Sequence, residues 1–329
     1  MTPDDLMAVA LAAAATVRTT TSPNPWVGCA IECADGSLVT GATQPPGGPH
    51  AERVALAAAG ERARGGRVAV TLEPCDHHGR TPPCTDALVA AGVSTVYVGV
   101  SDSDPRVRGA GIAALRRHGI EVVEGVRGDE AAGQLASYLH HRRTGRPYVI
   151  LKLAATLDGR TAAADGSSRW ITGDAARADA HLLRAESDAV LVGAGTVRAD
   201  DPALTVRRPD GTPAAVRQPR RIVLGRAPIG SRVHPCTEMS GPLEDVLTRL
   251  GDEGVLQVLV EGGARVAGEF HRSGLVDRYV VYLAPALAGG DDGAPLFSGP
   301  GAPTVHDLWR GRIVRTTQLG LDLRIDLVP

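Results

Sequence analysis

The chain has 329 residues, with 35 Lys or Arg against 37 Asp or Glu, so its formal net charge is −2. This length exceeds one ordinary domain and fits two, each large enough to fold without disulfides. The balanced charge, with no block of one sign, argues against nucleic acid or an anionic membrane as the main partner. Aromatic residues are only 3% of the chain, which excludes a base-stacking platform.

The N-terminal residues lack the pattern of a secretory signal. Asp4 and Asp5 stand where basic residues would be expected, and the apolar stretch Leu6–Ala15 is too short to span a bilayer. The chain has five cysteines, Cys29, Cys33, Cys75, Cys84 and Cys236. An odd number favours thiols over a disulfide framework. We therefore expect a cytoplasmic protein with a small-molecule substrate and with no nucleic-acid or membrane partner.

Helical and strand-like segments alternate along the first half. Leu6–Val17 is rich in alanine and predicts a helix, and the Asp35-Gly36 turn predicts a hairpin of Val27–Glu32 with Ser37–Thr43. The other predicted segments are helix Ala51–Arg64, strand Val68–Leu72, helix Thr85–Ala91, strand Thr95–Val100, helix Ile112–His118, strand Ile120–Val123 and helix Asp129–His141. This alternation predicts an α/β domain over residues 1–146.

A basic, polar joint at His140–Pro147 precedes a second α/β domain, predicted over residues 147–329. Its predicted strands are Tyr148–Leu153, Ala189–Val192, Arg221–Leu224, Val255–Val260 and Arg278–Leu283. Helices are predicted at Ala175–Glu186 and Arg265–Ser273. The stretches Arg207–Arg220 and Gly289–Pro303 are rich in Pro, Arg or Gly and predict loops.

The first half carries the residues of a zinc site. His50 opens a predicted helix with Glu52 two residues on, Cys75 follows a predicted strand, and Cys84 opens the next helix. One imidazole and two thiolates leave a fourth zinc position open for water, which is the catalytic arrangement, and helix N-termini favour a thiolate. The carboxylate of Glu52 can take a proton from that water and pass it to a leaving amine. H-x-E followed by P-C is typical of zinc deaminases, although here eight residues instead of two separate the cysteines.

Three motifs of this half together resemble a riboflavin-pathway pyrimidine deaminase, namely Pro23–Gly28, His50–Glu52 and Thr71–Cys75. The spacer His77–Cys84 is similar to that family specifically and differs from cytidine and tRNA adenosine deaminases. The resemblance implies that Asn24 orients the substrate ring. The chain departs from the family at Asp76 and at Asp102–Pro105, which affects the expected contacts to the ring or the phosphate but not the zinc chemistry. Cys29, Cys33 and Cys236 are interpreted as packing residues, and Cys29 could also line the pocket.

Glycines follow two predicted strands of the second half, at Gly193 and at Gly262-Gly263. Such turns let backbone N–H groups approach a phosphate, and the absence of G-x-G-x-x-G argues against an ordinary Rossmann domain. The segment order is similar to the reductase half of the bifunctional riboflavin biosynthesis family, whose fold is like dihydrofolate reductase. The segments that carry this similarity are Leu151–Ala154, Leu157–Arg160, Trp170–Thr172, Val197–Thr205 and Val260–Gly263.

The resemblance covers nearly the whole chain and implies contacts residue by residue. The implied NADPH contacts are Ala154, Trp170, Thr196, Asp200, Arg226, Gly263, Ala264, Arg265, Val266, Ala267, Gly268 and Glu269. The implied substrate contacts of the reductase half are Ser168, Arg184, Leu204, Arg207 and Glu261. Arginines suit phosphate groups, including a 2′-phosphate at Arg226. Opening the sugar ring needs an acid or base, for which Asp200, Lys152 and Glu261 are candidates and Asp200 is preferred.

The family activity implied is bifunctional. A zinc-bound hydroxide would deaminate 2,5-diamino-6-ribosylamino-4(3H)-pyrimidinone 5′-phosphate, and NADPH would then reduce the ribosyl group, giving 5-amino-6-ribitylamino-uracil 5′-phosphate. A homodimer or homotetramer through the reductase half is also implied. Three alternatives stay open on sequence alone: a nucleic-acid deaminase, a deaminase with a non-catalytic C-terminal module, and a zinc-stabilised protein without enzymatic activity.

Overall fold

The structure, a computed structural model, describes residues 1–77, 82–104, 107–208 and 210–329 and divides into two compact units, Met1–Gly145 and Arg146–Pro329. Residues 78–81 of the predicted spacer, and Pro105 of the motif that departs from the family, lie outside the described residues. The predicted domain ranges 1–146 and 147–329 stay a prediction, because compactness alone does not establish that either unit folds by itself.

The first unit is built on a sheet with the strand order β2-β1-β3-β4-β5. Its strands are β1 (Gly28–Glu32), β2 (Leu38–Ala42), β3 (Arg67–Leu72), β4 (Thr95–Val100) and β5 (Glu121–Glu124). β1 is antiparallel to β2 and β3, whereas β3, β4 and β5 are parallel. The predicted hairpin is confirmed, and Gly36 supplies the positive φ of 81° at its turn.

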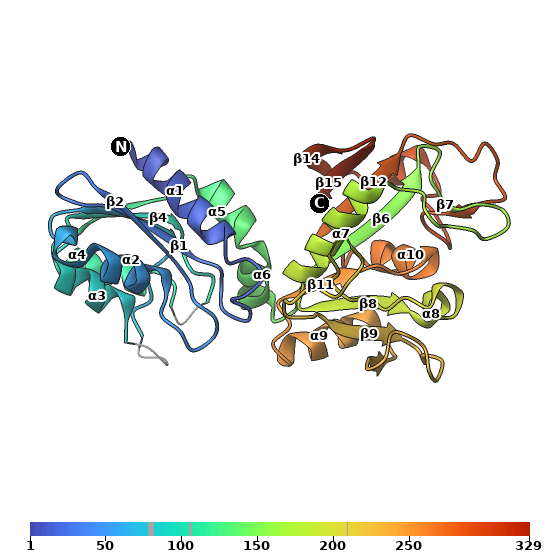
Figure 1. Ribbon diagram of the computed structural model, residues 1–329, viewed down its shortest axis with the longest axis horizontal. Helices are drawn as coiled ribbons and strands as arrows, with labels where there is room; N and C mark the ends of the chain where they lie inside the picture. The colour runs from blue at the N-terminus through green and yellow to red at the C-terminus, as the bar shows by residue number, and fades with distance from the viewer. Residues whose placement is uncertain (78–81, 105–106, 209) are drawn as a thin grey trace. The chain divides into compact units, whose positions relative to one another are not determined.

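Helices cover both faces of this sheet (Figure 1). They are α1 (Pro3–Ala15), α2 (Ala51–Ala59), the 3₁₀ turn η1 (Gly60–Ala63), α3 (Cys84–Ala91), α4 (Ala110–Arg117), α5 (Gly128–Gln134) and α6 (Ala136–Thr144). Two glycines allow the closest approaches. A Cβ on Gly28 would lie 1.9 Å from the carbonyl oxygen of Ala10 in α1, and one on Gly41 would lie 2.4 Å from that of Ala51 in α2. Close packing against both faces therefore requires glycine at these two strand positions.

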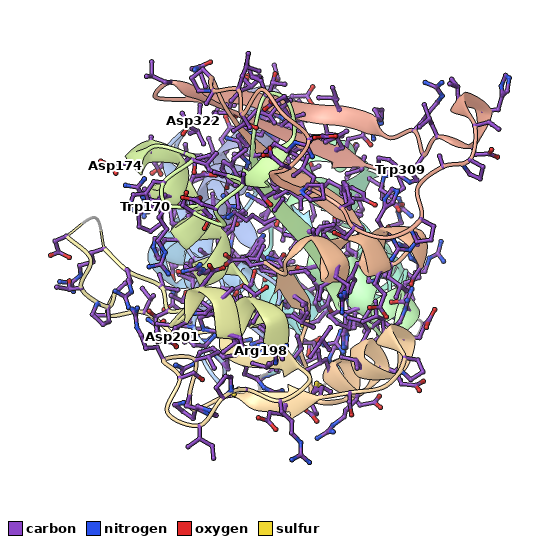
Figure 2. All side chains as sticks on the ribbon, turned by 90° about the vertical axis from the view of Figure 1, so that its right-hand side faces the viewer. Trp170, Asp174, Arg198, Asp201, Trp309 and Asp322 are labelled. Atoms are coloured by element: carbon purple, nitrogen blue, oxygen red, sulfur yellow. The ribbon has the colours of Figure 1, made fainter. Side chains whose placement is uncertain are left out.

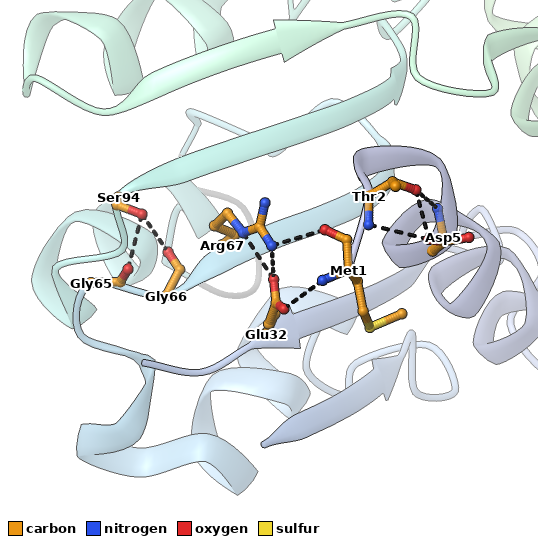
Figure 3. Close-up of polar contacts among 8 residues, drawn as sticks. All are labelled: Met1, Thr2, Asp5, Glu32, Gly65, Gly66, Arg67 and Ser94. Atoms are coloured by element: carbon orange, nitrogen blue, oxygen red, sulfur yellow. Dashed lines mark hydrogen bonds and ion pairs between the residues drawn. The ribbon is translucent and has the colours of Figure 1, made fainter. Parts of the chain in front are cut away.

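Polar contacts fix the start of α1 and the C-terminal end of β1 (Figure 3). Thr2 and Asp5 form a capping box, in which the Asp5 amide donates to Thr2 Oγ1 at 3.1 Å. Between β1 and β3, Arg67 Nε donates to Glu32 Oε2 at 2.8 Å. One prediction needs correction: the single helix Asp129–His141 is two helices that meet at Leu135, and α6 continues into the segment predicted as a joint.

The second unit holds an eight-stranded sheet in the order β10-β9-β8-β11-β6-β12-β15-β14. Its strands are β6 (Tyr148–Thr156), β8 (Ala189–Gly193), β9 (Arg220–Leu224), β10 (Thr237–Met239), β11 (Gln257–Val260), β12 (Arg278–Ala284), β14 (Arg312–Leu319) and β15 (Asp322–Val328). The first six in sheet order are parallel, and β15 is antiparallel to both neighbours. The five predicted strands are confirmed, but β10 and the C-terminal hairpin β14–β15 were not predicted.

A small antiparallel pair, β7 (Arg160–Ala162) with β13 (Ala294–Pro295), stands beside the main sheet. The predicted loop Gly289–Pro303 was therefore wrong at β13, because two residues are too few to give a periodic signal. The helical elements of this unit are α7 (Asp174–Glu186), α8 (Ala194–Asp200), α9 (Leu243–Asp252), α10 (Ala264–Arg272) and the 3₁₀ turn η2 (Val305–Asp307).

The core of the second unit has one apolar layer on each face of the sheet. Ile150 of β6 packs with Leu183 of α7, whereas the next residue, Leu151, packs with Leu247 of α9 and Phe270 of α10. This alternation follows from the two-residue period of a strand, and near-continuous apolar strands are what a sheet covered on both faces requires. Within the described residues, every helix is too short or too polar to cross a membrane.

Candidate functional site

Three side chains of the first unit converge as a metal site. His50 is the N-cap of α2, Cys75 follows β3, and Cys84 is the first residue of α3. His50 Nδ1 lies 3.6 Å from Cys75 Sγ and 3.5 Å from Cys84 Sγ, and the three ligand atoms lie within 4.8 Å of one another. Tetrahedral zinc, with Zn–N and Zn–S bonds of about 2.1 and 2.3 Å, places N and S about 3.6 Å apart. The three residues therefore fit zinc.

The environment of this cluster favours ligation and proton transfer. Hydrogen bonding from Cys84 outweighs burial and, together with His50, lowers the pKa of the Cys75 thiol. Glu52, in the first turn of α2, is buried, and this burial together with the charge of Cys75 raises the pKa of its carboxyl group to about 7. A carboxyl group with such a pKa can exchange a proton near neutral pH.

A cavity of about 240 Å³ opens beside the cluster. Four of the residues predicted for the deaminase site, Asn24, His50, Glu52 and Cys75, line it, whereas Cys84 is buried behind it. Cys29 and Cys33 are buried but do not line the cavity, and Cys236 packs partly buried in the second unit. Other polar residues line this cavity as well: His77, Asp102 and Asp104 from the motifs compared with the family, and Thr43, Glu73, Tyr138 and Arg142, for which no contact was predicted.

The positions that depart from the family pattern make defined contacts. Asp76 Oδ1 accepts a hydrogen bond of 2.6 Å from Thr85 Oγ1 in the first turn of α3. Asp102 Oδ1 accepts from the Asp104 amide at 2.9 Å, and Asp102 Oδ2 accepts from Tyr138 Oη at 3.1 Å. Tyr138 and Arg142 lie four residues apart on α6, so a helical spacing of the basic joint is the one sequence signal that could have indicated Arg142.

Glu73 holds the strand end that leads to Cys75. Its carboxylate is buried and accepts hydrogen bonds of 3.0 to 3.4 Å from four backbone amides, those of Asp102, Gly109, Gly111 and Ile112. Three of these amides belong to the start of α4, where a carboxylate is favoured by the helix dipole. Glu73 therefore ties β3, α4 and the Asp102 turn together next to the metal cluster.

The second unit contains a cavity of about 970 Å³. Nine residues predicted to contact NADPH or substrate line it: Ala154, Ser168, Trp170, Arg184, Thr196, Asp200, Leu204, Arg207 and Glu261. Arg226 is exposed beyond the turn at Gly225 and does not line it, and neither do residues 263–269, although the Gly263 amide donates to Thr196 Oγ1 at 3.0 Å. Among the described lining residues, six arginines and Lys152 face four carboxylates. The donor set therefore fits an anionic cofactor such as NADPH.

Two residues predicted to contact substrate contact each other. Arg184 Nε and Nη2 lie 2.5 and 2.9 Å from Glu261 Oε1 and Oε2, and Arg184 Nη1 donates to the Thr205 carbonyl oxygen at 3.1 Å. Burial opposes ionisation of Glu261, but the charges of Arg184 and Lys152 outweigh it and lower the pKa of Glu261 to about 2. Burial also lowers the pKa of Lys152.

Fold and site define the class of the protein. The His-Cys-Cys cluster with a buried glutamate belongs to a zinc-dependent deaminase, and the second unit is a reductase domain like dihydrofolate reductase. Residues 2–100 match the zinc-binding region of cytidine and deoxycytidylate deaminases, and residues 147–324 match the RibD C-terminal domain. The chain belongs to the RibD family of bifunctional deaminases and reductases of riboflavin biosynthesis, which use zinc and NADPH.

Relatives match over nearly the full length. The riboflavin biosynthesis protein RibD of Mycobacterium tuberculosis is 43% identical over 335 residues, covering 99% of this chain and 97% of that protein. RibD of Escherichia coli K12 is 42% identical over 361 residues, with 98% of each chain covered. A solved structure of Acinetobacter baumannii RibD superposes with a TM-score of 0.92 at 38% identity, covering 99% of this chain and 98% of that one.

Proposed function

We propose that the N-terminal half deaminates 2,5-diamino-6-ribosylamino-4(3H)-pyrimidinone 5′-phosphate and that the C-terminal half then reduces the ribosyl group to ribityl. The observation that carries the proposal is one cavity lined by Asn24, Glu52 and two members of the metal cluster, His50 and Cys75, with Cys84 completing the cluster behind them. A Thermotoga maritima structure named as a diaminohydroxyphosphoribosylaminopyrimidine deaminase/5-amino-6-(5-phosphoribosylamino)uracil reductase supports it, at 33% identity and a TM-score of 0.89 over 99% of this chain and 98% of that one.

In the deaminase half, zinc held by the three ligands would act as a Lewis acid toward water. The Glu52 carboxylate takes a proton from the water that adds to the ring carbon bearing the 2-amino group. It then gives that proton to the nitrogen that leaves as ammonia. Asn24 orients the ring, and Arg142, which lines the same cavity, supplies a cation for the 5′-phosphate.

In the reductase half, NADPH would supply a hydride to C1 of the opened sugar. Trp170, Thr196 and Ala154 form the cofactor side of the cavity in this proposal. Arg207 donates to two neutral acceptors, Thr205 Oγ1 and the Gly211 carbonyl oxygen, so its charge serves the substrate phosphate. Arg226 and residues 263–269 are retained as predicted cofactor contacts.

Ring opening needs a proton donor or acceptor in the same cavity. Glu261 is held ionised by Arg184, so we assign it to binding and not to proton donation. Asp200, the residue preferred from sequence, lines the cavity at the end of α8, and Lys152 is the second candidate because burial makes its proton easier to release. Comparing the pH–rate profiles of Asp200→Asn and Lys152→Met for NADPH oxidation separates them, since only loss of the titrating group removes a limb of the profile.

We further propose a homodimer or homotetramer through the reductase half, in the cytoplasm. β14 is an edge strand of the eight-stranded sheet, and large apolar side chains on and around the C-terminal hairpin are exposed, namely Val305, Leu308, Trp309, Ile313, Val314 and Leu321. An edge strand with exposed apolar residues pairs readily with a second copy. Light scattering should give a multimer for the parent and a monomer for Ile313→Lys, and a monomeric parent would contradict the proposal.

A paired assay tests the two reactions. Purified zinc-loaded protein receives the diaminopyrimidine ribosyl phosphate, and ammonia and NADPH absorbance are followed in one tube. We expect ammonia release without NADPH and cofactor oxidation once NADPH is added. Ammonia release without NADPH oxidation would contradict the reductase assignment. If folded protein gives neither ammonia nor NADPH oxidation, the proposed substrate is wrong.

A further inference from the structure

One wall of the reductase cavity is a run of consecutive residues, Ser168–Thr172, without helix or strand structure. Trp170 in this wall is 69% exposed, so burial of its own ring does not hold the wall in place. Arg177 of α7 holds this wall in place. Its guanidinium carbon lies 4.5 Å from the centre of the Trp170 ring, and its Nη1 donates to the Thr172 carbonyl oxygen at 2.7 Å. Arg169 Nη2 also donates to the Asp200 carbonyl oxygen of α8 at 2.5 Å, so it is the Trp170–Thr172 end of the wall that depends on where the first turn of α7 lies.

The start of α7 is held by a residue from the C-terminal hairpin. Gly173 is the N-cap of α7 and offers no side-chain cap, but its amide donates to Asp322 Oδ2 at 2.7 Å. Asp322 is buried and is the first residue of β15, after the turn from β14. Asp322, Asp174 and Trp170 lie on the same side of the unit in Figure 2.

The body of α7 has a separate anchor. Two residues beyond Asp322 on β15, Arg324 Nη1 lies 2.6 Å from Asp179 Oδ2 in the middle of α7. Tyr282 Oη of β12 donates to the same carboxylate oxygen at 2.6 Å. Because this second anchor is independent of Asp322, removing the Asp322 carboxylate should release the Trp170–Thr172 end of the wall while α7 stays packed on the sheet.

We propose that Asp322 is a positioning residue for cofactor binding, which acts through Gly173 to fix the Trp170–Thr172 end of this wall of the reductase cavity. The inference rests on the proposed function, since it takes this cavity as the NADPH site. The carboxylate acts on the backbone at the entrance to α7 and not on the cofactor itself. Its loss should therefore weaken NADPH binding without changing the chemical step.

The test uses the full chain with Trp26→Phe and Trp309→Phe, so that Trp170 is the only tryptophan. Asp322→Ala and Asp322→Asn are compared with this parent in two measurements, acrylamide quenching of Trp170 without NADPH and steady-state kinetics with NADPH. Loss of a charged hydrogen bond predicts a roughly five- to tenfold higher KM for NADPH in Asp322→Ala, with kcat within about twofold and more efficient quenching. Asp322→Asn keeps an acceptor without the charge, so its KM should rise by about two- to threefold.

Asp245→Ala is the matched control, because Asp245 is an exposed carboxylate in the first turn of α9 and does not line the cavity. It should leave quenching and KM unchanged, and ammonia release should be unchanged in every variant. Parent-like quenching and KM in the Asp322 variants would overturn the proposal. If Asp322→Ala does not fold, Asp322→Asn decides in the same way. A parent that oxidises no NADPH contradicts the proposed function instead, and the quenching data then still decide whether Asp322 fixes the wall.

Discussion

Glu73 and Gly111 meet at the start of α4, where the Gly111 amide donates to Glu73 Oε1 at 3.1 Å. A Cβ at position 111 would lie 1.9 Å from the carbonyl oxygen of Pro74, the residue between Glu73 and the metal ligand Cys75. A glycine on α4 therefore allows the helix to close onto the strand end that carries the ligand. We therefore expect the proposed zinc site to depend on this contact as well as on His50, Cys75 and Cys84.

Replacing Glu73 should weaken zinc binding. Glu73→Gln keeps one acceptor oxygen but turns an NH₂ group toward backbone donors, so the strand end before Cys75 loses its fixed position. Residues that orient metal ligands typically change metal affinity by about 10- to 100-fold, and we expect an effect of that size in competition with a chelating indicator. Glu61→Gln, at an exposed carboxylate just after α2, should bind zinc like the parent. An unchanged zinc affinity in Glu73→Gln would show that Glu73 does not position the strand end before Cys75.

Glu52→Gln should abolish ammonia release, because the amide cannot carry a proton from water to the leaving nitrogen. The loss expected for a general acid–base group is on the order of 10²- to 10⁴-fold. The zinc content and thermal unfolding of Glu52→Gln should match those of the parent. The control Glu61→Gln changes an exposed carboxylate just after α2 and should match the parent in ammonia release, zinc content and thermal unfolding. A Glu52→Gln protein that still deaminates at the parental rate would show that the proton carrier is another group.

The Arg184–Glu261 pair should make stability depend on pH. The pKa of Glu261 is lowered to about 2, so its stabilising contribution is present above the unfolded value of about 4.3 and is lost as the pH falls toward 2. The contribution is on the order of 3 kcal/mol. Calorimetry should show a lower Tm for Glu261→Gln than for the parent at pH 5. This difference in Tm should become smaller as the pH falls toward 3. The exposed Glu244→Gln should follow the parent, and a constant difference for Glu261→Gln would contradict the lowered pKa.

Removing zinc should separate the two activities. All three ligands lie in the unit Met1–Gly145, whereas the arginine-rich cavity lies in Arg146–Pro329. After dialysis against a chelator, ammonia release should disappear while NADPH oxidation with the deaminated intermediate continues. Added zinc should restore deamination. Loss of both activities on chelation would show that the reductase half depends on the metal.

Most of the first unit could be predicted from local sequence patterns. The Asp35-Gly36 turn sets its hairpin, and residue types at helix starts mark His50 and Cys84 as ligands, since each ligand is positioned by its own short segment. Arg142 was missed because it reaches the same cavity from α6, far along the chain. Its helical spacing from Tyr138 is the only local signal, and that spacing does not show which cavity the helix faces.

The limit of prediction from sequence is clearer in the second unit. Its strands could be predicted because apolar runs mark them, and nine of the predicted contacts line one cavity. The C-terminal hairpin was missed. β14 is mostly exposed and lacks the alternation of a half-buried strand, and β15 alternates but buries its polar residues Asp322, Arg324 and Asp326. Arg226 stays a predicted cofactor contact: its charge suits a phosphate, and it is exposed beyond the turn at Gly225, outside the cavity.

Residue types at short, fixed spacings were enough to predict an α/β fold, a His-Cys-Cys zinc site and the role of Glu52, and the resemblance to the riboflavin biosynthesis family implied the reductase fold and the two activities. The pairing of Arg184 with Glu261, the contact of Glu73 with α4 and the capping of Gly173 by Asp322 across 149 residues of chain became visible only in the tertiary structure. Such contacts join segments that are distant in sequence, so their partners are set by how strands and helices pack. No local pattern of residues encodes that packing.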